Sequence, residues 1–281
     1  MSRGELRYTP SGHALILPGD EPDAVVDALL ETAYAEEFCL SPSFDPPFLE
    51  SLMAAGFLVM SLRLQESGGP GSAILLPKLH LERAVLDPGE LRESRSVRRL
   101  LPRYELRSDV ALETVIGRCA AVHGEDWLTE ELRAAFRGMR APGARMARQA
   151  AAAAPEAALA GTAAAAPAEA SASPTGASAR LLSFGLFRDG RLVAGEFGAV
   201  AGGVYTSYSG YRDENSAGTV QMVLTGRLLR EAGFAFWDLG MPMEYKTALG
   251  ARSLDRAAFV ARFRSARCRT VQPLSSATIR S

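Results

Sequence analysis

The sequence predicts an α+β fold with a small N-terminal part and a larger C-terminal part, and three observations support this prediction. First, residues 180–187 and 191–198 are two β-rich runs whose connection contains Asp189-Gly190, a strong signal for a tight hairpin turn. Second, the chain from 202 to 239 has the pattern of a strand, a loop, a helix and a second strand. Third, the first 88 residues carry helix and strand signals of their own.

The predicted N-terminal domain covers residues 1–88 and is a small α+β unit. After a polar, irregular lead-in, apolar residues at helical spacing predict helices over 23–34 and 48–55. Two apolar runs, 57–62 and 73–81, flank a glycine-rich tip and predict a pair of strands.

The predicted second domain covers 89–281 and opens with the densest basic stretch of the chain, residues 91–101. Two interpretations stay open at this point. The stretch is either the solvated face of a helix whose leucines and Val97 point inward, or a patch that contacts phosphates. The side chains that would project together in the second case are Arg92, Arg95, Arg98 and Arg99.

A low-complexity segment interrupts the second domain over residues 141–179. About half of these residues are alanine, and several prolines break any long helix. The segment has too little apolar bulk to form a core, so we interpret it as a surface insertion. Before it, the pattern predicts a strand over 103–108, a helix capped by Asp109 and a helix capped by Thr129.

The stretch from Gly202 to Ala251 is the predicted centre of the site. Its first strand is rich in aromatic residues, and Asn215 or Ser216 can cap the helix that follows. The run 235–239 is then a short buried strand with Asp238 near its carboxyl end, where ligand sites in α/β sheets tend to lie. A hairpin sheet followed by this unit suggests an acetyltransferase-like (GNAT-type) fold. A last helix over 255–263 precedes a tail that we expect to be frayed from Arg267.

The composition restricts the class of protein. A formal net charge of −1 excludes a generally basic protein, so any contact with nucleic acid must come from a local patch. The 3 cysteines and 3 histidines are scattered, which predicts neither a disulfide framework nor a metal site. No run approaches a membrane span, and the first residues lack the apolar core of a signal peptide, so we expect a cytoplasmic protein.

Six segments, in this order, resemble the leucyl/phenylalanyl-tRNA–protein transferase family. They are Leu91-Arg-Glu-Ser-Arg-Ser-Val-Arg-Arg, Ala111-Leu-Glu-Thr-Val-Ile-Gly-Arg-Cys-Ala, Asp126-Trp-Leu-Thr, Leu192-Val-Ala-Gly-Glu-Phe-Gly, Asp213-Glu-Asn-Ser-Ala and Leu249-Gly-Ala-Arg. The resemblance implies an enzyme that moves leucine or phenylalanine from its tRNA to the N-terminal amine of a protein and so marks that protein for degradation. It also implies an acetyltransferase-like C-terminal domain, and we expect a monomer that needs no metal or organic cofactor.

The chain departs from the pattern of this family at four places. Where members have Gly-Glu-Ser-Met-Phe-Ser, this sequence has Thr206-Ser-Tyr-Ser-Gly-Tyr, so Ser207 replaces the glutamate that would face a basic protein N-terminus. Asp238-Leu239-Gly240 lacks the glutamine that members have after the central strand. Tyr245 stands in place of a histidine, and Phe57-Leu-Val-Met in place of Phe-Pro-Trp. These changes bear on substrate choice and on activity.

Transfer of an aminoacyl group needs little further activation, because the aminoacyl ester is already activated. The enzyme mainly has to align an amine with the ester carbonyl. Asp238 is the candidate for positioning that amine; the alternative is that it caps the following turn. Trp127 either stacks on a terminal adenine or is a core residue at the start of a helix. The remaining candidates for substrate binding are Tyr205, Ser207, Tyr208, Glu214, Asn215, Gly240, Met241 and Tyr245. Those for the acceptor stem of tRNA are Lys78, Arg92, Arg95, Arg98 and Arg99.

We therefore expect an aminoacyl-tRNA–protein transferase, with two alternatives from other classes. One is an acyl-CoA-dependent N-acetyltransferase, which the acidic loop Arg212–Gly218 disfavours because such enzymes need a glycine-rich loop for the pyrophosphate. The other is a module that binds tRNA or protein N-termini without turnover, which the missing glutamate and glutamine favour.

Overall fold

The computed structural model describes residues 6–66, 69–124, 126–140, 178–274 and 278–280. Most of the predicted alanine-rich insertion, from 141 to 177, lies outside the described residues. None of the helices in the described part combines the length and apolar composition that a membrane crossing requires.

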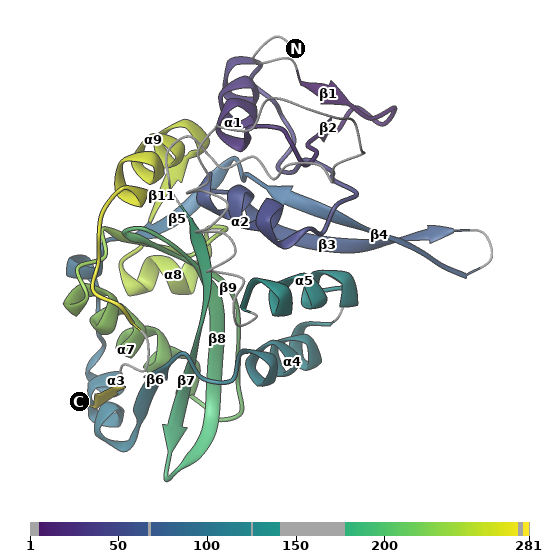
Figure 1. Cartoon of the computed structure of the whole chain (residues 1–281). Helices are drawn as coiled ribbons and strands as arrows, with labels where there is room; N and C mark the ends of the chain where they lie inside the picture. Colours follow the sequence, from purple (N-terminus) through teal and green to yellow (C-terminus); the bar gives the residue numbers. More distant parts are fainter. Residues whose placement is uncertain (1–5, 67–68, 125, 141–177, 275–277, 281) are drawn as a thin grey trace, which may run out of the picture.

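One mixed sheet dominates the molecule (Figure 1). Among the described residues it has eight strands in the order β11-β5-β10-β9-β8-β7-β6-β12. Every neighbouring pair is antiparallel except β9 and β10, which are parallel. The strands are β5 (Glu82–Leu86), β6 (Glu105–Ser108), β7 (Ala179–Arg188), β8 (Arg191–Ala201), β9 (Val204–Arg212), β10 (Phe236–Asp238), β11 (Arg252–Asp255) and β12 (Thr278–Arg280).

The unit predicted for the C-terminal part is present. Strands β7, β8 and β9 form an antiparallel meander, helix α7 (Ala217–Glu231) follows, and β10 returns parallel to β9. At the predicted hairpin, Asp189 has φ 51° and Gly190 has φ 78°, the left-handed pair that a tight turn between twisted strands needs. The α+β class is confirmed, and the predicted order of strand, helix and strand is present.

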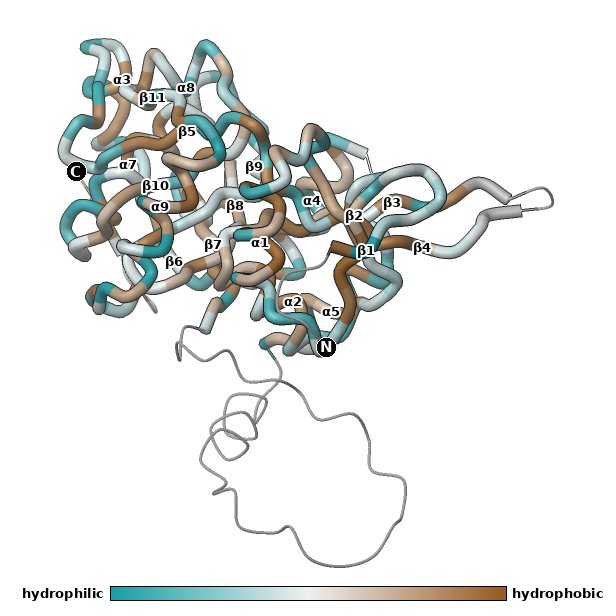
Figure 2. The backbone as a smooth tube through the Cα atoms, turned by 90° about the horizontal axis from the view of Figure 1, so that it is seen from above, coloured by the Kyte–Doolittle hydropathy of each residue, from teal (hydrophilic) through white to brown (hydrophobic). Residues whose placement is uncertain are grey.

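The N-terminal elements form a separate lobe above the sheet in Figure 1. They are β1 (Arg7–Tyr8), β2 (Ala14–Leu15), α1 (Pro22–Glu31), α2 (Pro46–Ala54), β3 (Leu58–Glu66) and β4 (Gly69–Lys78). Figure 2 shows the β3–β4 ribbon extending away from the body of the protein. The sequence predicts an irregular lead-in, but Arg7 pairs with Leu15 in a short ribbon.

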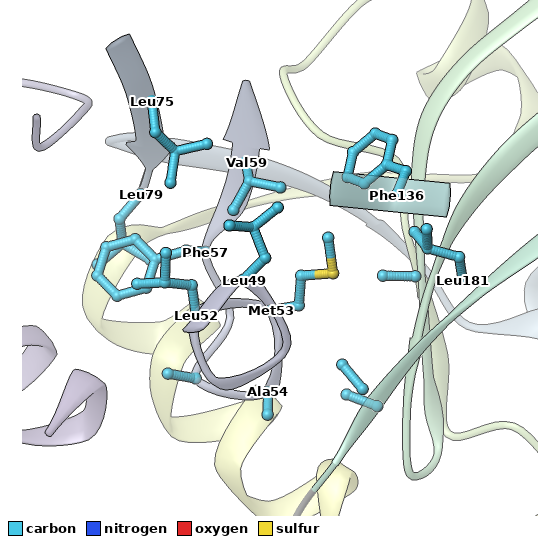
Figure 3. Packing of buried hydrophobic residues seen from close by; sticks show 14 of the residues in the cluster. Leu49, Leu52, Met53, Ala54, Phe57, Val59, Leu75, Leu79, Phe136 and Leu181 are labelled. Atoms are coloured by element: carbon cyan, nitrogen blue, oxygen red, sulfur yellow. The ribbon is translucent and has the colours of Figure 1, made fainter. Parts of the chain in front are cut away.

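Two hydrophobic clusters lie on opposite faces of the sheet. One contains residues of α2, α4 (Leu112–His123), α5 (Glu130–Arg140) and α9 (Arg256–Arg267). Figure 3 shows its centre, where Leu49, Met53 and Val59 of the N-terminal lobe approach Phe136 and Leu181. The other cluster lies under α7, α3 (Arg95–Leu100) and α8 (Glu244–Leu249). The boundary between domains at residue 88 stays a prediction, and β5, which precedes it, lies inside the large sheet.

Three local predictions are wrong. Asp109 has φ 56° and does not cap α4, whose N-cap is Ala111, because the chain turns at Asp109 on leaving β6. Ser216 occupies the N-cap position of α7, but its φ of 67° leaves its side chain without a capping hydrogen bond. The tail after Arg267 is not frayed throughout: Leu274 is buried, and β12 pairs with β6.

Candidate functional site

The parallel strands β9 and β10 separate at the carboxyl end of β10. β10 pairs with β9 from Val204 to Thr206 and then ends, while β9 continues to Arg212. Among the described residues, β9 pairs with β8 along one edge from Ser207 onward, while no strand pairs with its other edge. Exposure follows this geometry, since β9 is buried up to Thr206 and partly or fully exposed over 207–210. The Gly210 carbonyl oxygen in this stretch already accepts a hydrogen bond from His123 Nε2 at 2.7 Å. The remaining backbone past Thr206 lies at the position where parallel strands commonly bind a ligand.

The loop after β10 forms an apolar rim beside this opening. Met241, Met243 and Tyr245 are each about half exposed, and a shallow depression is lined by Pro242, Met243, Glu244 and Thr247. The Lys246 ammonium donates to the carbonyl oxygens of Leu239 at 2.6 Å and of Met241 at 2.7 Å, which fixes the loop from within. Burial lowers the pKa of Lys246. Neighbouring exposed methionines and a tyrosine are typical of a contact surface for a ligand or partner.

Asp238 lies at the end of β10 as predicted, but its side chain faces the interior. It is fully buried and pairs with the equally buried Arg83, with an N···O distance of 2.5 Å. The same carboxylate accepts hydrogen bonds from the Thr206 hydroxyl at 3.1 Å and from the Gly240 N–H at 2.9 Å. This geometry supports the interpretation that Asp238 caps the following turn. A role in positioning an amine stays a prediction, and such an amine would compete with the donors already in place.

Near Gly240, the N-terminal lobe contacts the loop that follows β10. It has φ 74°, a conformation that favours glycine, and a Cβ atom added there would lie 3.9 Å from Leu58 Cδ1. Arg83 also donates to the Gly56 and Lys78 carbonyl oxygens, each at 3.3 Å. The start of β3 is thereby held against the loop after β10.

Tyr208 and Trp127 lie on the face of the sheet that carries α4 and α5. Trp127 is half-buried and stacks on Phe197 with ring centroids 6.4 Å apart and planes 12° apart. Phe136 and Tyr208 complete the aromatic group, and the Tyr208 hydroxyl accepts a long hydrogen bond of 3.5 Å from the Val59 N–H. The core interpretation of Trp127 fits this packing. Stacking of an adenine on its exposed part stays a prediction.

Tyr205 and Ser207 belong to the opposite face, beneath α7. The Trp237 indole donates to the Ser207 hydroxyl at 2.7 Å, and the Tyr205 hydroxyl donates to Glu196 at 3.4 Å. Alternation along β9 therefore divides the predicted tyrosines between two faces, and they do not line one surface together.

Glu196 is a residue of this region that the sequence did not single out. It lies in β8, is 6% exposed, and is hydrogen-bonded to Tyr205 of β9 and to Thr225 of α7, of which Thr225 is 0% exposed. Burial raises the pKa of Glu196 to about 8, against smaller lowering contributions from Tyr205 and Thr225. A glutamate within the otherwise apolar strand 192–198 was the available signal.

Glu214 and Asn215 lie beyond the far end of β9. Glu214 pairs with Arg188 of the β7–β8 hairpin at 2.8 Å, and Asn215 is exposed. At about 3.3 Å per residue, this end of β9 is roughly 20 Å from Thr206. Their predicted role in orienting the loop before α7 is not tested by this geometry.

The predicted tRNA-binding residues separate into two groups. Arg95, Arg98 and Arg99 are exposed on α3, and Arg92 just before it is also exposed, while Val97 points inward. Lys78 ends β4, and Figure 1 shows β4 and α3 in different parts of the molecule. Arg98 also pairs with Glu93 at 3.2 Å. The arrangement is compatible with both interpretations of the basic stretch. In the described part of the chain, no group of three or more histidine, cysteine or acidic side chains is placed to hold a metal ion.

The fold is a mixed α+β architecture whose candidate site lies where β9 and β10 separate. Residues 177–264 match the family model described as leucyl/phenylalanyl-tRNA protein transferase, and this match includes β7 to α8 and most of α9. The predicted resemblance is thus confirmed for this segment, which is similar to the leucyl/phenylalanyl-tRNA–protein transferases.

Curated proteins with this name are similar over most of the chain. The one from Pseudomonas putida (strain W619) is 28% identical over 182 residues, which are 63% of this chain and 65% of that protein. The one from Rubrobacter xylanophilus is 26% identical over 200 residues, 70% of this chain and 85% of that protein. The chain spans slightly less than two thirds of the length of the Pseudomonas and Azoarcus relatives that it matches.

Two solved structures are also similar, with low scores. The C-terminal domain of a lysylphosphatidylglycerol synthetase from Agrobacterium fabrum has a TM-score of 0.36 at 14% identity and covers 93% of this chain and 80% of its own. A GCN5-related N-acetyltransferase from Kribbella flavida has a TM-score of 0.28 at 15% identity, with 86% and 77% covered. Similarity at this level is too weak to assign a function.

Proposed function

We propose that this protein is an aminoacyl-tRNA–protein transferase, which moves an amino acid from its tRNA to the N-terminal amine of a protein or peptide. One observation carries the proposal. The opening along β9, with its rim from Met241 to Tyr245, lies within residues 177–264, the segment that matches the transferase family.

The proposed reaction is the attack of a neutral amine on the ester carbonyl that joins the amino acid to the tRNA. The amine nitrogen forms an amide bond, the 3′ oxygen of the tRNA leaves, and the amine loses a proton. Since the ester is activated, alignment of the two reactants supplies much of the catalysis. The open side of β9 from Ser207 to Ser209 has backbone groups at the spacing of an extended peptide, so we assign it to the acceptor.

The rim and the buried ion pair have supporting roles in this proposal. Met241, Met243 and Tyr245 would contact apolar parts of the substrates, since their side chains are half exposed and adaptable. The pair between Arg83 and Asp238 would hold the floor of the opening in a fixed position. No metal or organic cofactor takes part in the proposed reaction.

The basic residues of α3 are the proposed contact for the tRNA acceptor stem. Arg95, Arg98 and Arg99 extend into solvent from adjacent positions of one short helix, with Arg92 just before it. Because the net charge of the chain is only −1, such a local patch has to supply the attraction to phosphates. Lys78 would make a separate contact. The proposed setting is the cytoplasm, the proposed state is a monomer, and the proposed consequence for the acceptor is degradation.

Acyl-CoA-dependent acetylation is the weaker alternative. The loop that precedes α7 carries Asp213 and Glu214, and Ser216 leaves the start of the helix without a side-chain cap. Arg118 and Arg188 pair with these two carboxylates, but the loop Arg212–Gly218 has one glycine, whereas a loop that holds a pyrophosphate at a helix N-terminus is glycine-rich. Transfer from acetyl-CoA to a peptide, with none from aminoacyl-tRNA, would select this alternative.

The test is a transfer assay with purified protein, tRNAs charged with each amino acid, and a peptide library that varies the first residue. The proposal predicts peptides that gain one aminoacyl residue on the α-amine, identified by fragmentation mass spectrometry. Peptides whose α-amine is acetylated serve as the matched control, because they have no free amine to attack the ester. Binding of tRNA without any modified peptide would favour the binding-module alternative.

A further inference from the structure

The backbone of β9 presents alternate residues to the side of β10. The Gly203 carbonyl oxygen, just before β9, accepts hydrogen bonds from the Ala235 N–H at 2.8 Å and from the Phe236 N–H at 3.5 Å. Neighbouring residues of a strand direct their backbone groups to opposite edges, so Ser207 faces the same side as Gly203. Since the pairing with β10 stops at Thr206, the Ser207 N–H and C=O groups point to the unpaired part of this edge.

A β-bulge shifts this alternation. Ser207 and Ser209 pair with consecutive residues of β8, so Tyr208 between them is an extra residue on β9. A bulge of this kind places two residues of one strand opposite one residue of the other. The next residue after Ser207 that faces the unpaired edge is therefore Gly210. These two residues are the first positions beyond β10 at which the backbone of a ligand can pair.

The second of these positions is already occupied. The Gly210 carbonyl oxygen accepts a hydrogen bond of 2.7 Å from Nε2 of His123, the last residue of α4. The same helix is attached to the end of β9 a second time, because Arg118 forms an ion pair with Asp213. The guanidinium of Arg118 also lies 4.7 Å from the centroid of the Tyr211 ring. These contacts hold the end of α4 against the strand, so the closure at Gly210 follows from the packing of the helix.

The rim after β10 gives the direction of the acceptor. The loop that carries Met241 leaves the sheet at the carboxyl end of β10, beside Thr206. In the proposed reaction the donor ester and the acceptor amine meet at this rim. The amine therefore lies at the Thr206 end of the open stretch, and the chain behind it runs toward Gly210, parallel to β9. From Ser207 to Ser209 this stretch is roughly 10 Å long, the length of three extended residues.

We infer that His123 closes the edge of β9 and thereby limits recognition of the acceptor backbone to the first three residues of the acceptor. The inference rests on the proposed function. The acceptor pairs with Ser207, and its fourth residue leaves the sheet because the Gly210 carbonyl oxygen is bound to the imidazole. The substrate class is a polypeptide with a free amine and three extended residues behind it. A folded acceptor has to expose no more than this segment.

The first experiment measures transfer to hexapeptide amides that carry one backbone N-methyl group, placed in turn at each residue from the second to the sixth. Methylation removes the donor of one backbone hydrogen bond. We expect kcat/KM to fall by about 5- to 10-fold for methylation at the second or the third residue, whichever directs its N–H group to Ser207. Methylation from the fourth to the sixth residue should change kcat/KM by less than about 2-fold. A loss of the larger size at the fourth residue or beyond would overturn the inference.

Variants of His123 test the cause of the limit. His123→Ala frees the Gly210 carbonyl oxygen, so methylation at one residue from the fourth to the sixth should now lower kcat/KM by about 5- to 10-fold. His123→Gln retains a side-chain N–H donor and should keep the limit at three residues. Val122→Ala, at the exposed preceding position of α4, is the matched control and should show the wild-type pattern. A wild-type pattern in the alanine variant would contradict the role of His123.

A binding measurement separates this inference from the transferase activity. The probes are the same hexapeptides with a fluorophore at the carboxyl end and with the first residue varied, and anisotropy gives their Kd without turnover. We expect the same dependence on the methylated position in Kd. This dependence without transfer from any aminoacyl-tRNA supports the three-residue limit and contradicts the proposed function. Transfer that is insensitive to methylation at every position supports the proposed function and overturns the limit, as does the absence of binding by every probe.

Discussion

Arg83 and Asp238 form a fully buried ion pair, with 2.5 Å between Nη1 and Oδ2. The two residues are 155 positions apart and belong to β5 and β10, which are antiparallel neighbours in the sheet. Through Arg83 the pair also reaches the Gly56 and Lys78 carbonyl oxygens of the N-terminal lobe. It therefore joins the lobe, the sheet and the loop that forms the rim of the proposed site.

Replacing Asp238 by alanine should destabilise the whole fold. The substitution leaves the Arg83 guanidinium buried without its counter-ion, and removal of one partner of a buried pair typically costs roughly 3–5 kcal/mol. The free energy of unfolding in urea measures this, and Arg83→Met combined with Asp238→Ala should recover part of the stability. A stable Asp238→Ala protein that loses only turnover would instead indicate a direct role in positioning the amine.

Stability should fall as the pH rises through the neutral range because of Glu196. Its pKa is raised from 4.5 to about 8 in the folded protein, so between these values the folded state holds a proton that the unfolded state has lost. The contribution is complete below about pH 4.5 and is lost up to about pH 8, at most by about 1.4 kcal/mol per pH unit. Glu196→Gln should show a flatter dependence from pH 5 to 8. Parallel curves for the two proteins would exclude Glu196 as the source.

Lys246→Met should loosen the loop after β10. The ammonium is the donor to the Leu239 and Met241 carbonyl oxygens, and methionine fills the same space without a donor. We expect faster amide hydrogen exchange over 239–243, roughly 1–3 kcal/mol less stability and lower turnover. Arg191→Met, at an exposed position of the β7–β8 hairpin, is the control. Unchanged exchange in the methionine variant would mean that the loop is held by other interactions.

The basic patch on α3 is tested by its salt dependence. Arg95, Arg98 and Arg99 replaced together by alanine should weaken tRNA binding and reduce the slope of log affinity against log salt concentration by about 0.7–0.9 for each phosphate that is no longer neutralised. Arg191, Arg230 and Arg269, exposed elsewhere, provide a triple variant with the same change in charge. Equal effects of both triple variants would show that only the overall charge matters.

The parts of the fold that are formed by neighbouring stretches of the chain could be predicted from the sequence. The turn at Asp189-Gly190 follows from residues that tolerate positive φ, and the order β9, α7, β10 follows from apolar spacing within one segment. The place of β5 between β10 and β11 could not be predicted, because its neighbours come from much later in the chain. For the same reason nothing near Asp238 in the sequence indicated that Arg83 would be its partner.

For the candidate site too, contacts between segments that are distant in the sequence could not be predicted. A strand alternates its side chains between two faces, so the run from Tyr205 to Tyr208 looks like one aromatic group in sequence but is divided between α7 and α5 in space. Met241 and Tyr245 are close in sequence and both exposed, since they belong to one short segment that ends in the first turn of α8; their role in binding stays a prediction. Glu196 was missed because its partners, Tyr205 and Thr225, become apparent only when α7 lies against the sheet.

The central claim is that an aminoacyl group passes from tRNA to a peptide amine, and a single-turnover reaction tests it most directly. Excess purified protein is mixed with tRNA that carries a radiolabelled amino acid and with a peptide that has a free N-terminus. The proposal predicts that label appears on the peptide α-amine in the same amount as tRNA is deacylated, and that acetylation of that amine abolishes the transfer. Deacylation that releases only free amino acid, or label that stays on the tRNA while it is bound, would contradict the claim.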